Sequence, residues 1–165
     1  MANKDLANGF NIPKGVPYYA PRVWPATASQ TFTRGDMVYL DSAGRITIAT
    51  ATTAAVSGVS YTPVVSSTAG DDVWVFDNPM QEFEGQCSGS GALADPYTCA
   101  TLASCFDIEG TTGIMEINED ANSYDMIHII GVGTDPATGV KSAVGANQRK
   151  IFRINGAKHQ LRLSD

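Results

Sequence analysis

Alternating apolar and polar residues, interrupted by turn-forming residues, run along most of this chain. In residues 45–49, Ile46 and Ile48 fall on the same face of an extended backbone, as in a strand with one buried face. The run at 36–41 precedes it across the turn-forming stretch 42–44, so the two runs predict a hairpin. Strands are predicted in the same way at 36–41, 45–49, 56–61, 72–76, 80–86, 114–117, 126–132, 151–154 and 160–163. Many short strands at this spacing predict a mainly β fold, either an antiparallel β-barrel or a β-sandwich.

Residues 97–106 are the one stretch with the features of a helix. Asp95 is a good N-cap and Pro96 suits the first turn. Leu102 and Phe106 lie four residues apart and therefore share one helical face. The fold is expected to contain at most this one short helix.

The first 33 residues differ from the rest of the chain because prolines punctuate them. Prolines recur at every fourth position: Pro13, Pro17, Pro21 and Pro25. This spacing excludes a helix interior and favours extended backbone. Tyr18, Tyr19 and Trp24 lie between the prolines, and aromatics on a segment without its own core pack onto another surface. We expect an extended N-terminal arm at 1–33, packed on its own domain or on a partner subunit, and a single β-domain at 34–165.

Charge is sparse and segregated in this chain of 165 residues, a length typical of one domain. Only 17% of the residues are charged, and the net charge is −6. Between 46 and 140 there is no Lys or Arg, against thirteen Asp and Glu, whereas both ends carry an excess of basic residues. An acidic stretch must be solvated or covered by basic segments, so we expect the ends of the same subunit or of a neighbour to cover it.

The basic residues near the C-terminus alternate with apolar ones, as Ile151 and Phe152 show between Lys150 and Arg153. This pattern predicts a strand with one buried face instead of a disordered polybasic arm, so it argues against nucleic acid as a partner. We expect Arg149, Lys150 and Arg153 to face an acidic surface.

No stretch approaches the roughly twenty apolar residues of a membrane span, and residues 1–5 lack the apolar core of a signal peptide. We therefore expect no membrane partner, and synthesis and use without export. The three cysteines, Cys87, Cys99 and Cys105, are an odd number and do not indicate a disulfide framework. We interpret them as mostly reduced thiols, and a disulfide between two of them stays open.

Patterns that resemble catalytic motifs have a plainer structural interpretation. Residues 85–89 have the spacing of a nucleophile elbow around Cys87, but that elbow needs a strand that runs into a helix, and Gly and Ser follow here instead. His128 and His159, the two histidines of the chain, are the residues that could act as a general base for Cys87. Glu82 and Glu84 share one strand face and do not bracket a sugar as opposed carboxylates do, so we expect a solvated face.

The tripeptide Arg34-Gly35-Asp36 spells an adhesion motif, but it leads directly into a predicted strand. We therefore predict that the chain is not an enzyme and has no catalytic residues.

Metal and cofactor signals are equally weak. The cysteines lack the close Cys-x-x-Cys spacing of zinc sites. Asn118, Asp120 and Asn122 imitate the start of a calcium loop, but Ser123 and Ile129 stand where that loop needs Gly and Glu. We predict no metal site and no cofactor, and leave calcium near Asp120 open.

Four segments carry a resemblance to a known family. Residues 34–46 read Arg-Gly-Asp-Met-Val-Tyr-Leu-Asp-Ser-Ala-Gly-Arg-Ile, and residues 56–59 read Val-Ser-Gly-Val. Residues 70–76 read Gly-Asp-Asp-Val-Trp-Val-Phe, and residues 105–113 read Cys-Phe-Asp-Ile-Glu-Gly-Thr-Thr-Gly. This pattern of glycines and strands, spread over residues 34–132, resembles the head decoration (capsid cement) proteins of tailed bacteriophages.

The resemblance implies a small β-barrel or sandwich, commonly a homotrimer, on the outer capsid surface of the virion at local three-fold positions. There it would clamp neighbouring subunits of the major capsid protein after the shell expands. The arm lies outside the resemblance, so its role is inferred from its own residues. The residues expected to contact partners are Pro13, Pro17, Tyr18, Tyr19, Pro21, Trp24, Pro25, Arg149, Lys150 and Arg153. The alternative function is a host-receptor or glycan-binding head-fibre or tail module, because exposed Tyr and Trp also suit stacking on sugars.

Overall fold

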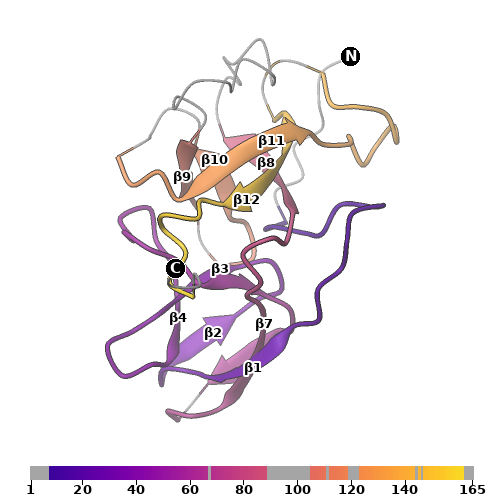
Figure 1. Ribbon diagram of the computed structural model, residues 1–165. Coiled ribbons are helices and arrows are strands. Elements are labelled where there is room, and N and C mark those ends of the chain that lie inside the picture. The colour runs from indigo at the N-terminus through magenta and orange to yellow at the C-terminus, as the bar shows by residue number, and fades with distance from the viewer. Residues whose placement is uncertain are drawn as a thin grey trace.

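In the computed structural model, all regular secondary structure of the described residues is β-strand (Figure 1). The structure describes residues 8–66, 68–88, 105–110, 112–118, 123–143, 145 and 147–161. The expected mainly β fold is therefore confirmed.

The N-terminal half forms a five-stranded antiparallel sheet in the order β1-β7-β5-β3-β4. Its strands are β1 (Arg22–Pro25), β3 (Met37–Leu40), β4 (Ile46–Ile48), β5 (Gly58–Ser60) and β7 (Asp72–Phe76). A two-stranded ribbon, β2 (Gln30–Phe32) with β6 (Val64–Ser66), contributes Phe32 and Val64 to the cluster on one face of that sheet. The predicted hairpin is confirmed, because Val38 to Leu40 pair with Ile48 to Ile46.

The C-terminal half is a small barrel whose strands hydrogen-bond in the closed order β10-β8-β12-β11-β9. Its strands are β8 (Phe83–Ser88), β9 (Cys105–Glu109), β10 (Glu116–Asn118), β11 (Ile127–Val132) and β12 (Arg149–Ile154). Strands β8 and β10 pair in parallel, and the other neighbours are antiparallel. A register shift between Ile129 and Gly131 marks an irregularity in β11.

One hydrophobic cluster joins the sheet to the barrel, which lies above it in Figure 1. Met37, Val59 and Phe76 come from the sheet, and Phe83 and Phe152 come from the barrel. Each of these side chains is at most 5% exposed. The two halves therefore share a core.

The predicted helix at 97–106 is wrong where the structure can test it. Residues 97–104 lie outside the described part of the chain, but Cys105 and Phe106 begin β9. Strand β9 pairs with β10 and β11, and its Ile108 is 1% exposed in the shared core. Pairing and burial in the tertiary structure outweigh the local helical pattern. The predicted strand at 160–163 is also wrong in its first two residues, because Gln160 and Leu161 form a turn.

The N-terminal arm packs on its own chain at both ends of its described part. Near its start, Phe10 is 2% exposed, and its ring meets that of Phe152 edge-on with centroids 5.0 Å apart. Near its end, β1 forms an edge of the five-stranded sheet and β2 pairs with β6. Of the two expected alternatives, packing on its own domain describes this single chain.

The segment after β12 returns from the barrel to the sheet, where its described end lies near β3 and β4 (Figure 1). The N–H of Val56 donates to the carbonyl of Lys158, and the N–H of Gln160 donates to the carbonyl of Val56. The Gln160 side-chain amide also bonds both backbone groups of Leu40, at 2.7 and 3.0 Å. These contacts hold Leu161 beside the sheet.

Candidate partner-binding surface

A groove of about 660 Å³ lies between the arm, the turn after β7 and the C-terminal segment. The arm and β1 contribute one wall, the turn 77–80 contributes a second, and Leu161 contributes a third. Its lining residues are Tyr19, Ala20, Arg22, Asp77, Asn78, Pro79, Met80 and Leu161. The volume lies in the range of sites that take a small molecule or a few residues of a peptide.

Asp77 is the fixed polar point beneath this groove. Its side chain is 3% exposed, whereas that of Arg22 is 61% exposed. Arg22 Nε donates to both carboxylate oxygens, at 2.9 and 2.7 Å, and Trp24 Nε1 donates to Oδ2 at 2.7 Å. Strand β1 brings both donors to this carboxylate because Arg22 and Trp24, two residues apart, share the sheet face of Val73 and Val75.

Arg22 is held from two directions. Its Nε is bound to Asp77, and its guanidinium carbon lies 5.6 Å from the centre of the Trp24 ring. In the part of the chain that the structure describes, no acceptor bonds the two terminal nitrogens of Arg22. The end of the guanidinium therefore stays available to a ligand.

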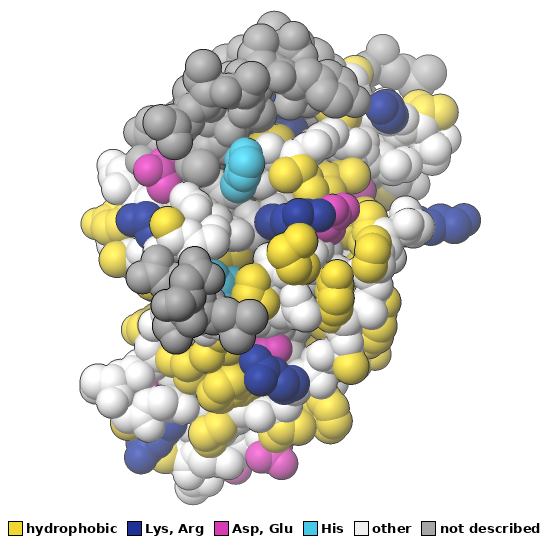
Figure 2. Space-filling model, in the orientation of Figure 1, with side chains coloured by type: hydrophobic (Ala, Val, Ile, Leu, Met, Phe, Trp, Pro, Cys, Tyr) yellow, Lys and Arg dark blue, Asp and Glu magenta, His cyan; other side chains and the backbone are white. Residues whose placement is uncertain are grey.

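Large apolar side chains are exposed both in the groove and on the opposite face of the sheet. Tyr18 is 60% exposed and Met80 is 53% exposed, and Val23 on β1 pairs with the exposed Trp74 on β7. Tyr18 also meets the Phe76 ring edge-on, with centroids 5.5 Å apart, so it is anchored at one edge. Figure 2 shows hydrophobic side chains gathered over the sheet half of the face in view, with few charged groups among them. Such a patch on a single chain is typical of a surface that contacts another molecule.

His159 lies close to the same polar cluster. It is 2% exposed, and its Nδ1 accepts the N–H of Leu161 at 3.1 Å. Burial lowers the pKa of His159, the nearby Asp77 carboxylate opposes that shift, and Arg22 adds to it. The imidazole is therefore kept neutral inside the fold at neutral pH.

The structure brings only some of the arm residues expected to contact partners to this surface. Tyr19 lines the groove, where its backbone N–H donates to Gln81 Oε1 at 3.0 Å, and Tyr18 is exposed beside it. Trp24 is half-buried and uses its indole N–H internally. Among the four prolines, the structure places Pro13 in the interior, Pro21 half-buried, and Pro17 and Pro25 on the surface.

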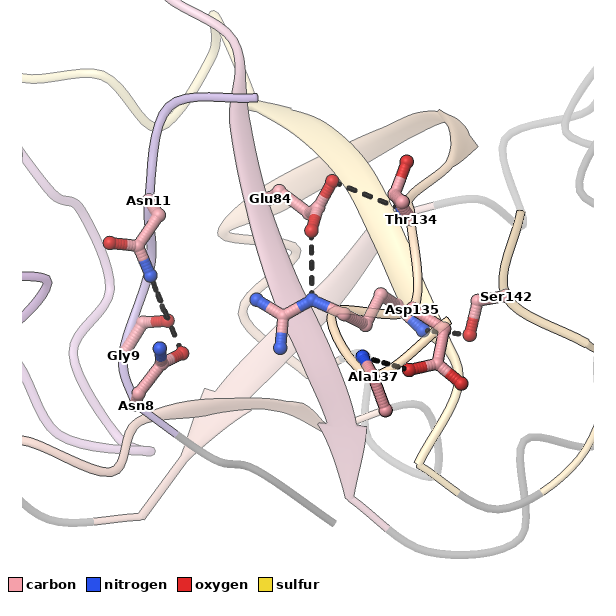
Figure 3. A network of polar contacts seen from close by, with 9 residues as sticks. Asn8, Gly9, Asn11, Glu84, Thr134, Asp135, Ala137 and Ser142 are labelled. Carbon is pink, nitrogen blue, oxygen red and sulfur yellow. Dashed lines mark hydrogen bonds and ion pairs between the residues drawn. The ribbon is translucent and has the colours of Figure 1, made fainter. Parts of the chain in front are cut away.

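Two of the three basic residues of β12 are buried. Arg149 Nε donates to Glu84 at 2.8 Å, with side-chain exposures of 6% and 15% for the pair. Figure 3 shows that Glu84 also accepts the backbone N–H of Thr134, so its two oxygens are both engaged. Lys150 is fully buried, and Arg153 pairs with Glu82. In the isolated chain, Arg149 and Lys150 therefore present no exposed charge.

The expected solvated carboxylate face at Glu82 and Glu84 is wrong. Glu84 pairs with Arg149, and Glu82 pairs with Arg153. Both arginines lie on β12, two residues before and two residues after Ile151, which is paired with Glu84 across the β8–β12 ladder. Together with Arg22 and Asp77, these pairs join the basic ends of the chain to its acidic middle within one subunit.

In the adhesion-like tripeptide Arg34 is exposed, but Gly35 and Asp36 are buried. Asp36 is 0% exposed, and its carboxylate accepts the backbone N–H groups of Thr33 and Gly113, at 2.7 and 2.6 Å. It thereby ties the turn before β3 to the turn before β10. Burial raises the pKa of Asp36, and these two backbone hydrogen bonds partly oppose that shift.

The other candidate motifs are placed as follows. Cys87 is fully buried within β8, so residues 85–88 do not form an exposed elbow; Cys99 and the side chain of Cys105 lie outside what the structure describes. The calcium-like stretch is outside it at 119–122. Within the described ranges there is no cluster of three His, Cys, Asp or Glu that could hold a metal ion. None of the described segments is a helix long and apolar enough to cross a membrane.

Sequence reasoning missed Asp77, Met80 and Leu161 as groove residues. The pattern assigned Met80 to a strand that in fact begins at Phe83. The Asp-Asn-Pro sequence at 77–79 signals a turn, but only the pairing of β1 with β7 brings that turn to Arg22. No local signal in the sequence predicts this contact between the turn and Arg22.

No protein-family model matches this chain, and no curated protein is significantly similar to it.

Proposed function

We propose that this chain is a structural virion protein that binds the outer surface of a phage capsid. As a homotrimer, it would cement neighbouring subunits of the major capsid protein and so stabilise the expanded head. The resemblance of residues 34–132 to capsid decoration proteins supports this proposal. The structure adds a β-rich scaffold that presents a groove with exposed apolar side chains.

Exposed apolar surface, in the groove and on the opposite face of the sheet, is the observation that carries the proposal. Tyr18, Val23, Trp74 and Met80 are all more than 40% exposed, as are Val65, Ile114 and Val140 elsewhere, whereas most other large apolar residues of the described chain are buried. These side chains lie on rigid elements: Val23 and Trp74 are paired across β1 and β7, and Tyr18 rests on Phe76. A rigid aromatic surface loses little conformational entropy when a partner covers it.

A cement role needs many modest contacts instead of one very tight one. Many identical copies on one shell act together, because each bound arm or subunit raises the effective concentration of the next contact. A surface of exposed aromatic and aliphatic side chains together with the accessible Arg22 is suited to this use.

Stoichiometry in purified particles of the phage that encodes the chain is the direct test. Quantitative mass spectrometry would compare its copy number with that of the major capsid protein. A ratio near one supports a cement lattice over the whole shell. A ratio of a few per cent contradicts the lattice, and absence from particles contradicts the proposal altogether.

The alternative is a receptor- or glycan-binding module of a head fibre or tail. One specific observation favours it: the exposed Trp74 and Tyr18 rings offer flat surfaces on which sugars stack. The same copy-number measurement separates the two, because fibres are few per particle. A ratio of a few per cent together with binding of the purified chain to host-surface glycans would favour this alternative.

A further inference from the structure

We infer that the groove is a docking site for an extended peptide segment that carries a carboxylate beside an apolar side chain, and that Arg22 binds this carboxylate. The inference rests on the proposed function, because the segment is assigned to the major capsid protein.

The first support is the orientation of Arg22. Asp77 binds the guanidinium through Nε alone, so the end formed by the two terminal nitrogens points away from that carboxylate. Those nitrogens form no hydrogen bond with the part of the chain that is described, and Arg22 has 61% of its side chain exposed. The two parallel N–H groups of this end match the spacing of carboxylate oxygens.

Arg22 is also held in place before any ligand arrives. The bond to Asp77 and the Trp24 ring restrict the side chain, and the Trp24 indole in turn holds Asp77. A flexible surface arginine loses rotamer freedom on binding, whereas a restrained one has already lost most of it. Binding of a carboxylate here therefore costs less entropy than at an unrestrained arginine.

The charge that the groove shows to solvent is positive. Among the described residues of its lining, Arg22 and Asp77 are the two that carry charge, and the Asp77 side chain is only 3% exposed. All its described donors come from Arg22 and Trp24. An approaching ligand therefore meets the cation first, and the low-polarity walls strengthen its attraction for an anion.

The rest of the lining suits an apolar side chain next to that anion. Pro79, Met80 and Leu161 contribute aliphatic surface, and Tyr19 contributes an aromatic ring. Burial of one leucine-sized side chain here would add to the charged contact. Because the apolar wall adjoins Arg22, the apolar and acidic groups of the ligand must be neighbours.

A peptide fits these walls better than a sugar does. A sugar needs several acceptors and donors around its hydroxyls, but Asp77 already receives three hydrogen bonds and Asn78 Oδ1 accepts the N–H of Met80. Arg22 remains as the charged group that a ligand can use. The exposed Trp74 lies on the opposite sheet face from Arg22, so it does not add a stacking platform inside the groove.

The first experiment titrates the purified, ¹⁵N-labelled full chain with defined peptides and records NMR spectra. The probes are acetyl-Leu-Asp-Leu-amide, its matched acetyl-Leu-Asn-Leu-amide and chitotriose. We expect the Asp peptide to shift the Arg22 Nε–Hε and Trp24 indole signals, with about tenfold weaker binding of the Asn peptide. Equal binding of both peptides, or shifts there with chitotriose alone, would overturn the inference.

The second experiment measures co-sedimentation with expanded heads of the encoding phage that were assembled without this chain. The variants are Arg22→Gln, Arg22→Lys and, as a control for net charge, Lys141→Gln on an exposed loop. Arg22→Lys keeps a cation beside Asp77, which protects the fold, but removes the two-pronged end. We expect both Arg22 variants to bind at least about tenfold more weakly and Lys141→Gln to bind like the wild type.

The two experiments separate failure of the inference from failure of the proposed function. Wild-type chain that binds heads while both Arg22 variants bind equally well refutes the inference and leaves the cement role standing. If the wild-type chain does not bind heads, yet binds the Asp peptide at Arg22, the cement role is refuted and the carboxylate-binding site is supported.

Discussion

The ring of Phe10 lies directly against the backbone of Gly85 in β8. A Cβ added at Gly85 would stand 2.5 Å from Cδ1 of that ring, closer than real contacts allow. On its other side, the ring of Phe10 meets that of Phe152. The start of the arm is thus one of the packed layers of the shared core, so arm and body are parts of one folding unit.

The Phe10 contact predicts a large loss of stability on truncation. Phe10→Ala should lower the free energy of unfolding by about 3–5 kcal/mol, because the ring is fully buried and its site cannot collapse easily. Urea denaturation followed by Trp fluorescence would measure the loss. Lys14→Ala, at an exposed position of the same arm, serves as the control and should change stability by less than about 0.5 kcal/mol. A Phe10→Ala variant as stable as the wild type would mean that the arm is not part of the core.

Trp24 should contribute to stability through its indole N–H as well as its ring. In Trp24→Phe, most of the apolar contact remains but Asp77 loses the bond from Nε1. The expected cost is about 1–3 kcal/mol, the range for a buried charged group that loses a hydrogen bond. Thermal denaturation would measure it, and Trp74→Phe, whose side chain is exposed, is the matched control. Equal stability of the two variants would contradict the assigned role of the indole.

The sequence predicts the strands of this fold better than their partners. The run 72–76 matches β7 residue for residue, because alternation and flanking turn residues are local signals. Pro21 and Pro25 instead predict an irregular arm over the segment that forms β1. It is nevertheless a strand because it lies at a sheet edge, where proline is tolerated.

For the same reason, the sequence identifies only part of the candidate surface. The aromatic residues between the prolines point to Tyr18 and Tyr19, of which Tyr19 lines the groove and Tyr18 is exposed. Arg149 and Lys150 were expected to face an acidic surface, and the acidic group that meets Arg149 is Glu84 of the same subunit. Which acid meets which base depends on strand order, and that order is a long-range property that periodicity does not contain.

Asp36 should make the protein less stable as the pH rises. Its pKa is raised above the usual 3.8, chiefly by burial, so the folded state holds the proton more tightly than the unfolded state does. The stabilisation from this group is complete below 3.8 and is lost as the pH rises through the folded pKa. The unfolding free energy of the wild type minus that of Asp36→Asn should therefore fall over this window.

Asp41 is a control for Asp36, because its contribution to stability should change with pH in the opposite direction. Its pKa is lowered, first by the backbone N–H of Arg45, so its contribution is present above 3.8 and is lost as the pH falls. The wild-type advantage over Asp41→Asn should therefore grow as the pH rises. Slopes of the same sign for the two variants would contradict the assignment for Asp36.

His159 should destabilise the fold on acidification. Its pKa is lowered from 6.5, mainly by burial, so the unfolded chain takes up a proton more readily than the folded one. Stability from the neutral imidazole is present above 6.5 and is lost as the pH falls through the folded pKa. In His159→Asn, Oδ1 can replace Nδ1 as acceptor of the Leu161 N–H, so the variant removes the titration with little change in contacts.

Urea denaturation between about pH 7.5 and 5 would test the His159 prediction. The wild type should lose stability over this range, and His159→Asn should lose clearly less. His128→Asn, which replaces an exposed histidine on β11, should behave like the wild type. If both variants keep the full pH dependence, other groups control it.

The two arginine–glutamate pairs between β8 and β12 should contribute differently to the free energy of unfolding, because they differ in burial. Arg149 and Glu84 have side-chain exposures of 6% and 15%, against 37% and 19% for Arg153 and Glu82. Removal of one partner of the buried pair leaves an uncompensated charge, so Arg149→Ala should cost about 3–5 kcal/mol. Arg153→Ala leaves a carboxylate that water can reach, and should cost about 1 kcal/mol or less.

A double-mutant cycle would separate the pairing energy from the loss of packing. Adding Glu84→Ala to Arg149→Ala should recover part of the stability, because the stranded carboxylate is then gone as well. The same cycle at Arg153 and Glu82 should give a coupling energy near zero at high salt, where exposed charges are screened. Equal coupling energies for the two pairs would show that burial does not set their strength. Such a result would also imply that water, or a partner, reaches the Arg149 guanidinium.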